Sequence, residues 1–314
     1  MVAVPQITLS NGVSMPAVGL GTWQSTPEEV KKAVRVALES GYRLIDTAAI
    51  YQNEEAIGEA VEQAIADGIV TREQLFITTK AWTHEFAPGK LEAALRESLR
   101  KLKTTYVDLY LAHMPTATAQ DGSALDVTVE QVWQEFEHVY NLGLAKAVGV
   151  SNWNNDQIAR VLKSGKVAVH NSQVELHLYF AQHDHHDFCK ANNISVTSYA
   201  TLGSPGRVHF KLPTGQKVEW APAASDLEDS NVVAIAEKHH KTPAQVLLRY
   251  ALDRGIAIIP KSITPSRIVE NFQLFDFQLT QDEIALLESH KVNQRLFLQE
   301  FMAGHKEDAF PSER

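Results

Sequence analysis

The segment TPEEVKKAVRVALESGYRLID, residues 26–46, contains the pattern that decides the fold. Thr26, Pro27 and Glu29 are typical of a helix N-terminus, because the first and last of them can cap each other's backbone amides. Apolar residues then recur at helical spacing as far as Gly41, and a short run at 43–45 predicts a strand ending at Asp46. The segment therefore predicts one helix followed by one strand.

The same alternation extends along most of the chain. Further helices are predicted at 56–65 and 132–140 and from residues 242 and 280, and eight strands at 17–20, 43–45, 75–79, 107–112, 147–150, 172–174, 194–198 and 256–259. Alternation of this kind without a long linker predicts a (β/α)8 or TIM barrel, as a single α/β domain over 1–314. Residues 7–15, with Asn11-Gly12 at the turn, predict a β-hairpin that plugs the closed end. The irregular segments 203–230 and 291–314 are expected to form long loops at the C-terminal, binding face.

The composition disfavours several classes of protein. Among 314 residues, 38 Asp and Glu oppose 29 Lys and Arg, and a formal charge of −9 disfavours nucleic acid as a partner. No membrane span or signal peptide is recognised, and the single cysteine, Cys189, favours a cytoplasmic protein in which it is a core residue. His183 and His186 have helical ligand spacing without further partners, so no metal is expected.

Polar residues follow one predicted strand after another. They are Asp46, Lys80, His113, Ser151 with Asn152, Gln173, Tyr199 and Lys261. Functional side chains of a barrel lie at the C-terminal ends of its strands. Any one of these residues could be an ordinary strand-end polar group, but seven such positions on one rim indicate an active site.

Three longer stretches resemble the aldo-keto reductase family. They are GYRLIDTAAIYQNEEAIG (41–58), VDLYLAHMP (107–115) and IPKSITPSRIVENF (259–272), and the resemblance covers nearly the whole chain. It implies NADPH-dependent reduction of aldehydes or ketones by a catalytic tetrad of Asp46, Tyr51, Lys80 and His113, with Tyr51 as the proton donor. A lysine ammonium beside a phenol favours the ionised phenol, so Lys80 is suited to a position beside Tyr51. Histidine at position 113, where relatives that reduce carbon–carbon double bonds have glutamate, implies carbonyl reduction.

The resemblance also implies where NADPH binds. Ser151, Asn152 and Gln173 would hold the nicotinamide carboxamide, and Tyr199 would stack on its ring. The other implied cofactor residues are Gly21, Thr22, Trp23, Asp46, Leu202, Ser204, Lys261, Ser262, Ile263, Arg267, Glu270 and Asn271. Apart from the family, Thr264-Pro265 predicts a helix start, and its N-terminus together with nearby cations would attract a phosphate dianion. Gly19 and Gly21 lack the third glycine of a Rossmann motif.

The substrate pocket is expected to be apolar and aromatic. Its expected residues are Trp23, Tyr51, Trp82, His113 and Met114, with Phe297 or Phe301 from the tail, although Trp82 could equally belong to the core. Gly206 stands where several relatives have an aspartate that latches a loop over the cofactor, which leaves that latch in question. Three functions remain open for this expected monomer: a reductase of aldehydes or ketones, a dedicated steroid or other lipid ketone reductase, and a non-catalytic binding or regulatory barrel.

Overall fold

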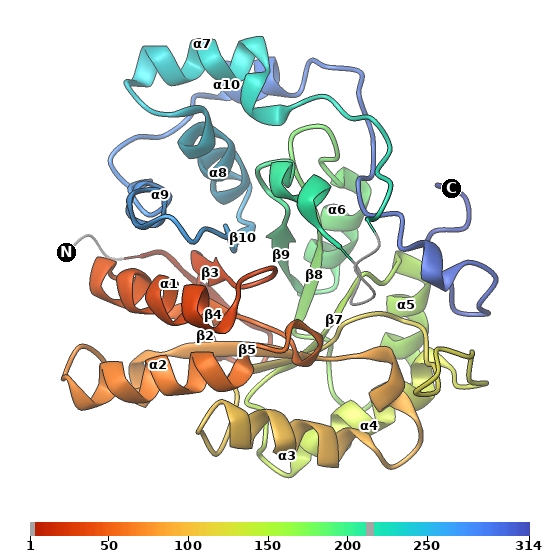
Figure 1. The fold of residues 1–314 in the computed structure, drawn as a ribbon. Coiled ribbons are helices and arrows are strands. Elements are labelled where there is room, and N and C mark those ends of the chain that lie inside the picture. The colour runs from red at the N-terminus through yellow and green to blue at the C-terminus, as the bar shows by residue number, and fades with distance from the viewer. Residues whose placement is uncertain (1–3, 212–216) are drawn as a thin grey trace.

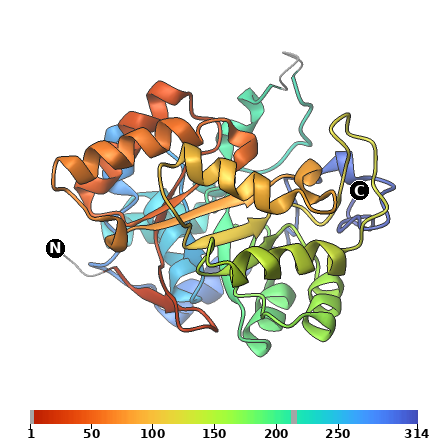
Figure 2. The same ribbon diagram turned by 90° about the horizontal axis from the view of Figure 1, so that it is seen from below.

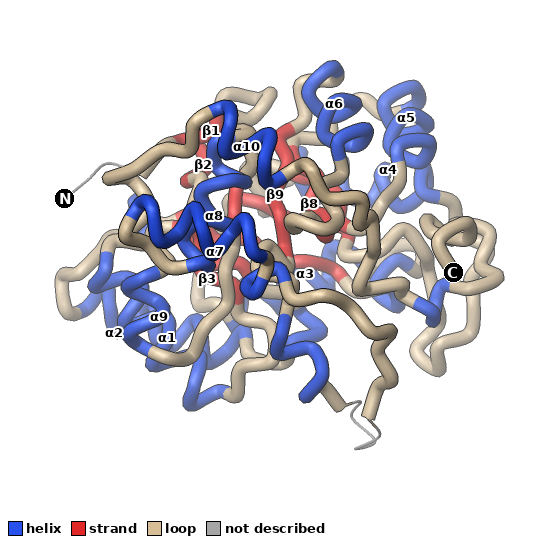
Figure 3. The backbone as a smooth tube through the Cα atoms, turned by 90° about the horizontal axis from the view of Figure 1, so that it is seen from above, coloured by secondary structure: helices blue, strands red, loops and turns tan. Residues whose placement is uncertain are grey.

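Eight parallel strands form the centre of the molecule, and helices surround them (Figures 1 and 3). The computed structural model describes residues 4–211 and 217–314. The strands of the barrel are β3 (Gly19–Gly21), β4 (Leu44–Asp46), β5 (Phe76–Ala81), β6 (Leu109–Ala112), β7 (Val148–Ser151), β8 (Asn171–Glu175), β9 (Ser195–Tyr199) and β10 (Ala257–Ile258). Each pairs with its neighbour in the chain, and each matches one predicted strand. The predicted (β/α)8 architecture is therefore confirmed.

The barrel closes between its first and last strands. Val18 forms a parallel bridge with Ile258, and Gly21 forms one with Lys261. Glycine is required at position 21, because a Cβ atom there would lie 2.5 Å from the carbonyl oxygen of Ile259. This seam brings Gly21 and Lys261 together at the C-terminal end of the barrel.

The outer layer is helical. It consists of α1 (Pro27–Ser40), α2 (Glu54–Ala66), α3 (Leu91–Lys101), α4 (Val129–Asn141), α5 (Asn155–Ser164), α6 (His183–Ala191), α7 (Ser230–His239), α8 (Pro243–Asp253), α9 (Pro265–Glu270) and α10 (Gln281–Leu287). Helix α1 begins as predicted, with reciprocal bonds between Thr26 and Glu29, and ends at Gly41 in the left-handed conformation. Helices α1–α6, α8 and α9 contribute buried residues to the main core around the barrel, in which Cys189 lies fully buried. Helices α7 and α10 pack with α8 in a second apolar cluster. In the described part of the chain, no helix has both the length and the apolar character needed to span a membrane.

The predicted hairpin covers the N-terminal end of the barrel. Strands β1 (Gln6–Thr8) and β2 (Ser14–Pro16) pair antiparallel with Ile7 opposite Met15 (Figure 2). Leu9 and Met15 are buried against inward-facing apolar residues of β4, β5 and β6. Because the hairpin covers the N-terminal end of the barrel, only the C-terminal end is open to a substrate.

The two irregular segments lie at the C-terminal end of the barrel, as expected. Apart from Ser230, where α7 begins, the helical parts of their described residues are short 3₁₀ helices. The C-terminal tail runs beside α5 (Figure 1). The buried carboxylate of Glu307 accepts hydrogen bonds from Nη1 and Nη2 of Arg160, both at 2.9 Å. Asn154 and Gln157 donate to carbonyl groups of the tail. These bonds from α5 fix a segment that has little regular structure of its own.

Candidate active site

Asp46 and Lys80 form a buried ion pair at the C-terminal end of the barrel. Lys80 Nζ donates to Asp46 Oδ1 at 2.5 Å and to the carbonyl oxygen of Thr47 at 2.9 Å, and the exposed fractions of the two side chains are 0% for Lys80 and 4% for Asp46. Gln173 Nε2 donates to the other carboxylate oxygen at 2.7 Å. Strands β4, β5 and β8 supply these three side chains, so hydrogen bonds offset the cost of burying the charges.

Tyr51 and His113 lie beside this pair. Tyr51 ends the 3₁₀ turn Ala49–Tyr51 that follows β4, and Lys80 Nζ is 5.2 Å from the centre of its ring. His113 directly follows β6, and its ring centre is 5.7 Å from that of Tyr51. The structure thus brings together all four residues of the tetrad expected from the sequence.

The pKa shifts favour neutral forms of both rings. Burial, followed by the charge of Asp46, raises the pKa of Tyr51 well above its usual range. Burial and the charge of Lys80 lower the pKa of His113 well below its usual range. The Lys80 ammonium was expected to favour the ionised phenol, but burial and the charge of Asp46 outweigh that effect. At neutral pH the site therefore presents a protonated phenol beside a neutral imidazole.

Asn152 joins the ends of three strands next to the tetrad. Its Nδ2 donates to the carbonyl oxygen of His113 at 2.9 Å, and its Oδ1 accepts from Tyr199 Oη at 2.6 Å. Ser151, Asn152 and Gln173 are buried, whereas Tyr199 is half-buried. Two amide side chains and a flat ring, grouped on one rim, have the chemistry to hold a planar group that carries a carboxamide.

A positively charged corner lies at the seam of the barrel. Lys261 and Arg267 are exposed, and Ser262 is buried between the seam and the start of α9. Although the Lys261 side chain reaches solvent, partial desolvation by its neighbours lowers its pKa, and the charge of Glu29 opposes that shift. Two cations beside the first amides of α9 suit a phosphate dianion. The remaining residues expected here, Ile263, Glu270 and Asn271, lie within or beside α9.

The loop after β9 carries Leu202 and Ser204, and the side chain of Arg207 forms hydrogen bonds with its backbone. Arg207 is buried, and its Nη1 donates to the carbonyl oxygens of Gly203 at 3.0 Å and Ser204 at 3.2 Å. Gly206 is exposed, and a Cβ atom there would meet nothing within 4 Å. The conformation of this loop therefore depends on Arg207 rather than on a side chain at position 206.

One group of apolar side chains connects the tetrad to the tail. Trp82 is half-buried, with its ring centre 5.0 Å from that of His113 and 5.6 Å from that of Phe301. Met114 is only 3% exposed and packs in a cluster with Met302 of the tail. Trp82 therefore contacts the tetrad through His113 and is not simply a core residue. Met114 belongs to the buried cluster against which Trp82 packs.

A second aromatic group joins β3 to both irregular segments. Trp23 lies 5.7 Å from Phe297 and 5.4 Å from Phe210, measured between ring centres. Phe297 is also 5.2 Å from Trp220 and 5.7 Å from Tyr199. The sequence indicated Trp23 and Phe297 but missed Phe210 and Trp220, because neither lies in a periodic pattern.

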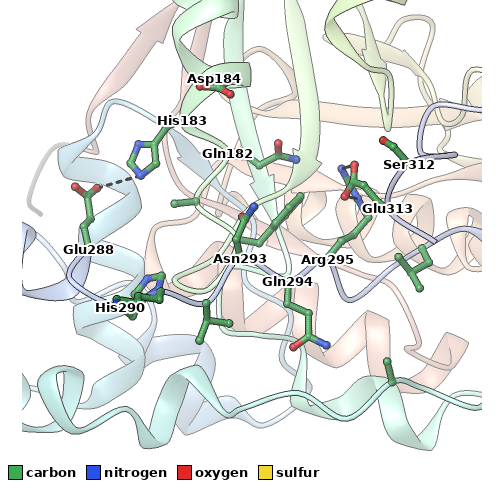
Figure 4. A pocket seen from close by; sticks show the side chains of 16 residues that line it. Gln182, His183, Asp184, Glu288, His290, Asn293, Gln294, Arg295, Ser312 and Glu313 are labelled. Carbon is green, nitrogen blue, oxygen red and sulfur yellow. Dashed lines mark hydrogen bonds and ion pairs between the residues drawn. The ribbon is translucent and has the colours of Figure 1, made fainter.

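A cavity of about 820 Å³ lies beside the start of α6, apart from the tetrad (Figure 4). It is lined mainly by residues 180–184, 288, 290–295, 298 and 312–313. His183 and Glu288 approach to 3.8 Å at its edge. Within residues 4–211 and 217–314, no group of three or more His, Cys, Asp and Glu side chains is arranged to hold a metal ion.

Comparison with known proteins defines the class of this barrel. The sequence profile described as the aldo/keto reductase family matches residues 17–292, so the chain belongs to the aldo-keto reductase family. Aldo-keto reductase family 1 member A1-A of Danio rerio is 40% identical over 306 residues, which cover 93% of this chain and 91% of that protein. An aldo-keto reductase of Bombyx mori is 40% identical over 301 residues, which cover 94% and 95% of the two chains.

Solved structures agree with this assignment. The crystal structure of the Bombyx mori enzyme in complex with NADP is similar with a TM-score of 0.89 at 38% identity, and the match covers 98% of this chain and 100% of that one. The aldose reductase of Schistosoma japonicum also gives a TM-score of 0.89 at 38% identity, with coverage of 99% and 100%. A second aldo-keto reductase, complexed with NADPH, has the same TM-score at 36% identity and 99% and 94% coverage.

Proposed function

We propose that this protein uses NADPH to reduce aldehydes or ketones to alcohols, with Tyr51 as the proton donor. The observation that carries the proposal is the buried Asp46–Lys80 pair beside a protonated phenol and a neutral His113. Family membership supports the reaction class, and relatives crystallised with NADP and NADPH support the cofactor.

The tetrad provides each group that carbonyl reduction needs. Bound NADPH supplies a hydride to the carbonyl carbon. As negative charge develops on the carbonyl oxygen, Tyr51 donates its phenolic proton to that oxygen. Lys80, held in place by Asp46, stabilises the phenolate that remains. His113 donates a ring N–H to the same oxygen and orients the carbonyl group.

The rim of the barrel fits NADPH without a Rossmann fold. Gln173 donates through its nitrogen to Asp46, which leaves its carbonyl oxygen for the carboxamide of the nicotinamide. Ser151 and Asn152 complete that subsite, and Tyr199 offers its ring for stacking. Leu202 and Ser204 would meet the pyrophosphate. The remaining residues of the proposed cofactor site are Gly21, Thr22, Trp23, Lys261, Ser262, Ile263, Arg267, Glu270 and Asn271.

The proposed pocket favours substrates with an apolar or aromatic group next to the carbonyl. Aromatic surface is supplied by Trp23, Trp82, Phe297 and Phe301, and the expected set is completed by Tyr51, His113 and Met114.

We also propose that the protein is cytosolic, because a chain with one buried cysteine is suited to a reducing compartment. We further propose that it is a monomer. Size-exclusion chromatography with light scattering tests the monomer.

The test is oxidation of NADPH in the presence of a panel of aldehydes, aromatic ketones and steroid ketones. We expect turnover by the wild-type protein and a loss of about 10²- to 10⁴-fold in Tyr51→Phe, with NADPH affinity unchanged. Tyr106→Phe, at the opposite end of the barrel, is the matched control and should retain full activity. Normal turnover by Tyr51→Phe would refute the role of the phenol, and no turnover with any carbonyl compound would favour a binding protein.

A further inference from the structure

A second buried charge cluster lies at the C-terminal end of β8. It consists of Glu175, His177 and Asp226, whose side chains are at most 1% exposed. His177 Nε2 is 3.1 Å from Glu175 Oε1, and its Nδ1 is 3.1 Å from Asp226 Oδ2. Burial alone would lower the pKa of His177, but its bonds to Asp226 and Glu175 raise it to about 9. The ring is therefore an imidazolium between two carboxylates at neutral pH.

Glu175 attaches the C-terminal tail to the barrel. Its carboxylate accepts hydrogen bonds from the amides of Leu296 at 2.5 Å and Phe297 at 2.9 Å. Hydrogen bonds to an ionised acceptor are about twice as strong as those between neutral groups. The carboxylate, at the end of β8, thus fixes the backbone of two consecutive tail residues that lie in no helix or strand themselves.

Asp226 brings the long loop to the same point. Its Oδ2 accepts the amide of Leu178 at 3.1 Å. Its other oxygen lies against Gly203, where a Cβ atom would come within 2.8 Å of it. The cluster therefore holds together the end of β8, the loop after β9 and the start of the tail.

The residue fixed by Glu175 is the one at the centre of the second aromatic group. Phe297 contacts the rings of Trp23, Trp220 and Tyr199. Glu175 also pairs directly with Tyr199 in the sheet, so its backbone and its carboxylate act on adjacent parts of one wall. Loss of the carboxylate would release Phe297 without removing any aromatic ring.

We propose that Glu175 is a positioning residue that, together with His177 and Asp226, holds Phe297 in place and so determines the affinity for carbonyl substrates with an aromatic group. This inference rests on the proposed reductase function. Glutamine at position 175 has nearly the same shape, but only one of its terminal atoms accepts hydrogen bonds. It cannot accept from two amides and the imidazolium as the carboxylate does.

The test compares 4-nitrobenzaldehyde with propanal as substrates of Glu175→Gln. We expect KM for the aromatic aldehyde to rise about tenfold, whereas kcat and the KM for propanal change less than about threefold. Amide hydrogen exchange of residues 295–299 should become faster. In the Phe297→Ala background, Glu175→Gln should have no further effect on the aromatic KM, since both variants remove the same contact.

Glu137→Gln is the matched control. Glu137 is also a buried carboxylate that accepts two consecutive backbone amides, those of Lys166 and Val167, but it belongs to α4. It should lose stability without changing the ratio of the two KM values. If Glu175→Gln does not fold, Asp226→Asn replaces it, with the same direction of change and about a threefold rise in the aromatic KM.

Two results would overturn the inference while leaving the reductase function intact. One is an unchanged KM ratio in Glu175→Gln, and the other is an effect that adds fully to that of Phe297→Ala. A wild-type protein that reduces neither aldehyde would instead refute the proposed function, and this inference with it. The exchange rates of residues 295–299 then still show whether Glu175 holds the tail.

Discussion

The tetrad and the aromatic pocket are constructed in two different ways. Asp46, Lys80 and His113 lie within or next to strands, so the geometry of the barrel alone determines their separations. Phe210 and Phe297 lie on irregular segments, which are held by side chains from distant parts of the chain. The difference means that substitutions in the irregular segments can change the shape of the pocket while the strands keep the geometry of the tetrad.

Removing the buried cation should have the largest effect. Lys80→Met leaves the Asp46 carboxylate buried without its partner, and we expect the free energy of unfolding to fall by about 3–5 kcal/mol together with loss of turnover. Urea denaturation and the NADPH oxidation assay measure the two losses. The double variant Asp46→Asn, Lys80→Met should recover most of the stability but none of the turnover. If the double variant is no more stable than Lys80→Met, the ion pair does not account for the loss.

The next effect concerns pH and the cluster that holds the loop and tail. The pKa of His177 is about 9 in the folded protein, above the value of about 6.5 for an unfolded chain. Its stabilising contribution is therefore complete below about pH 6.5 and is lost as the pH rises through about 9. We expect the free energy of unfolding to fall by about 3 kcal/mol over that window, measured by urea denaturation. His177→Gln should remove this pH dependence, and an equal slope in both proteins would assign it to other groups.

The charged corner at the seam should control the choice of cofactor. Arg267→Ala removes a cation that the proposed site uses for the 2′-phosphate, so the KM for NADPH should rise about tenfold. NADH lacks that phosphate and is the internal control, because its KM should not change. Lys261→Ala should act in the same direction. An unchanged preference for NADPH in both variants would place the phosphate elsewhere.

The smallest effect is expected where the tail meets α5. Glu307→Gln weakens the bonds to Arg160, and we expect a loss of about 1 kcal/mol with faster hydrogen exchange over residues 303–310. Glu130→Gln is the control, since Glu130 bonds to the same arginine but lies in α4. Its exchange over the tail should match that of the wild type. Equal exchange in Glu307→Gln and the wild type would show that other contacts hold the tail.

The two regions also differ in how far the sequence could predict them. Asp46 and Lys80 were predictable because each stands at the end of a recognisable strand. Tyr51 lies on a 3₁₀ turn without periodicity, so only family resemblance indicated it. Phe210 and Trp220 could not be predicted, since their positions depend on contacts between segments that are distant in the sequence.

The charge cluster at the end of β8 was only partly visible in the sequence. Glu175 and His177 continue the row of polar residues two and four positions beyond Gln173. Their partner Asp226, however, comes from the irregular segment, and no local pattern relates the two. Polar positions at a strand end could therefore be identified from the sequence. Their contacts with the long loop and the C-terminal tail could not be.

The closing seam between β3 and β10 has a consequence for the synthesis of the chain. The first barrel strand is made early but finds its second partner only when residues 257–261 have been added. Until then both ends of the growing sheet are open edges, at which another chain could pair. A chain truncated before β10 keeps these edges exposed and also lacks Lys261 and Arg267. Closure of the barrel and assembly of its charged corner therefore depend on the same late-made segment, which begins with β10.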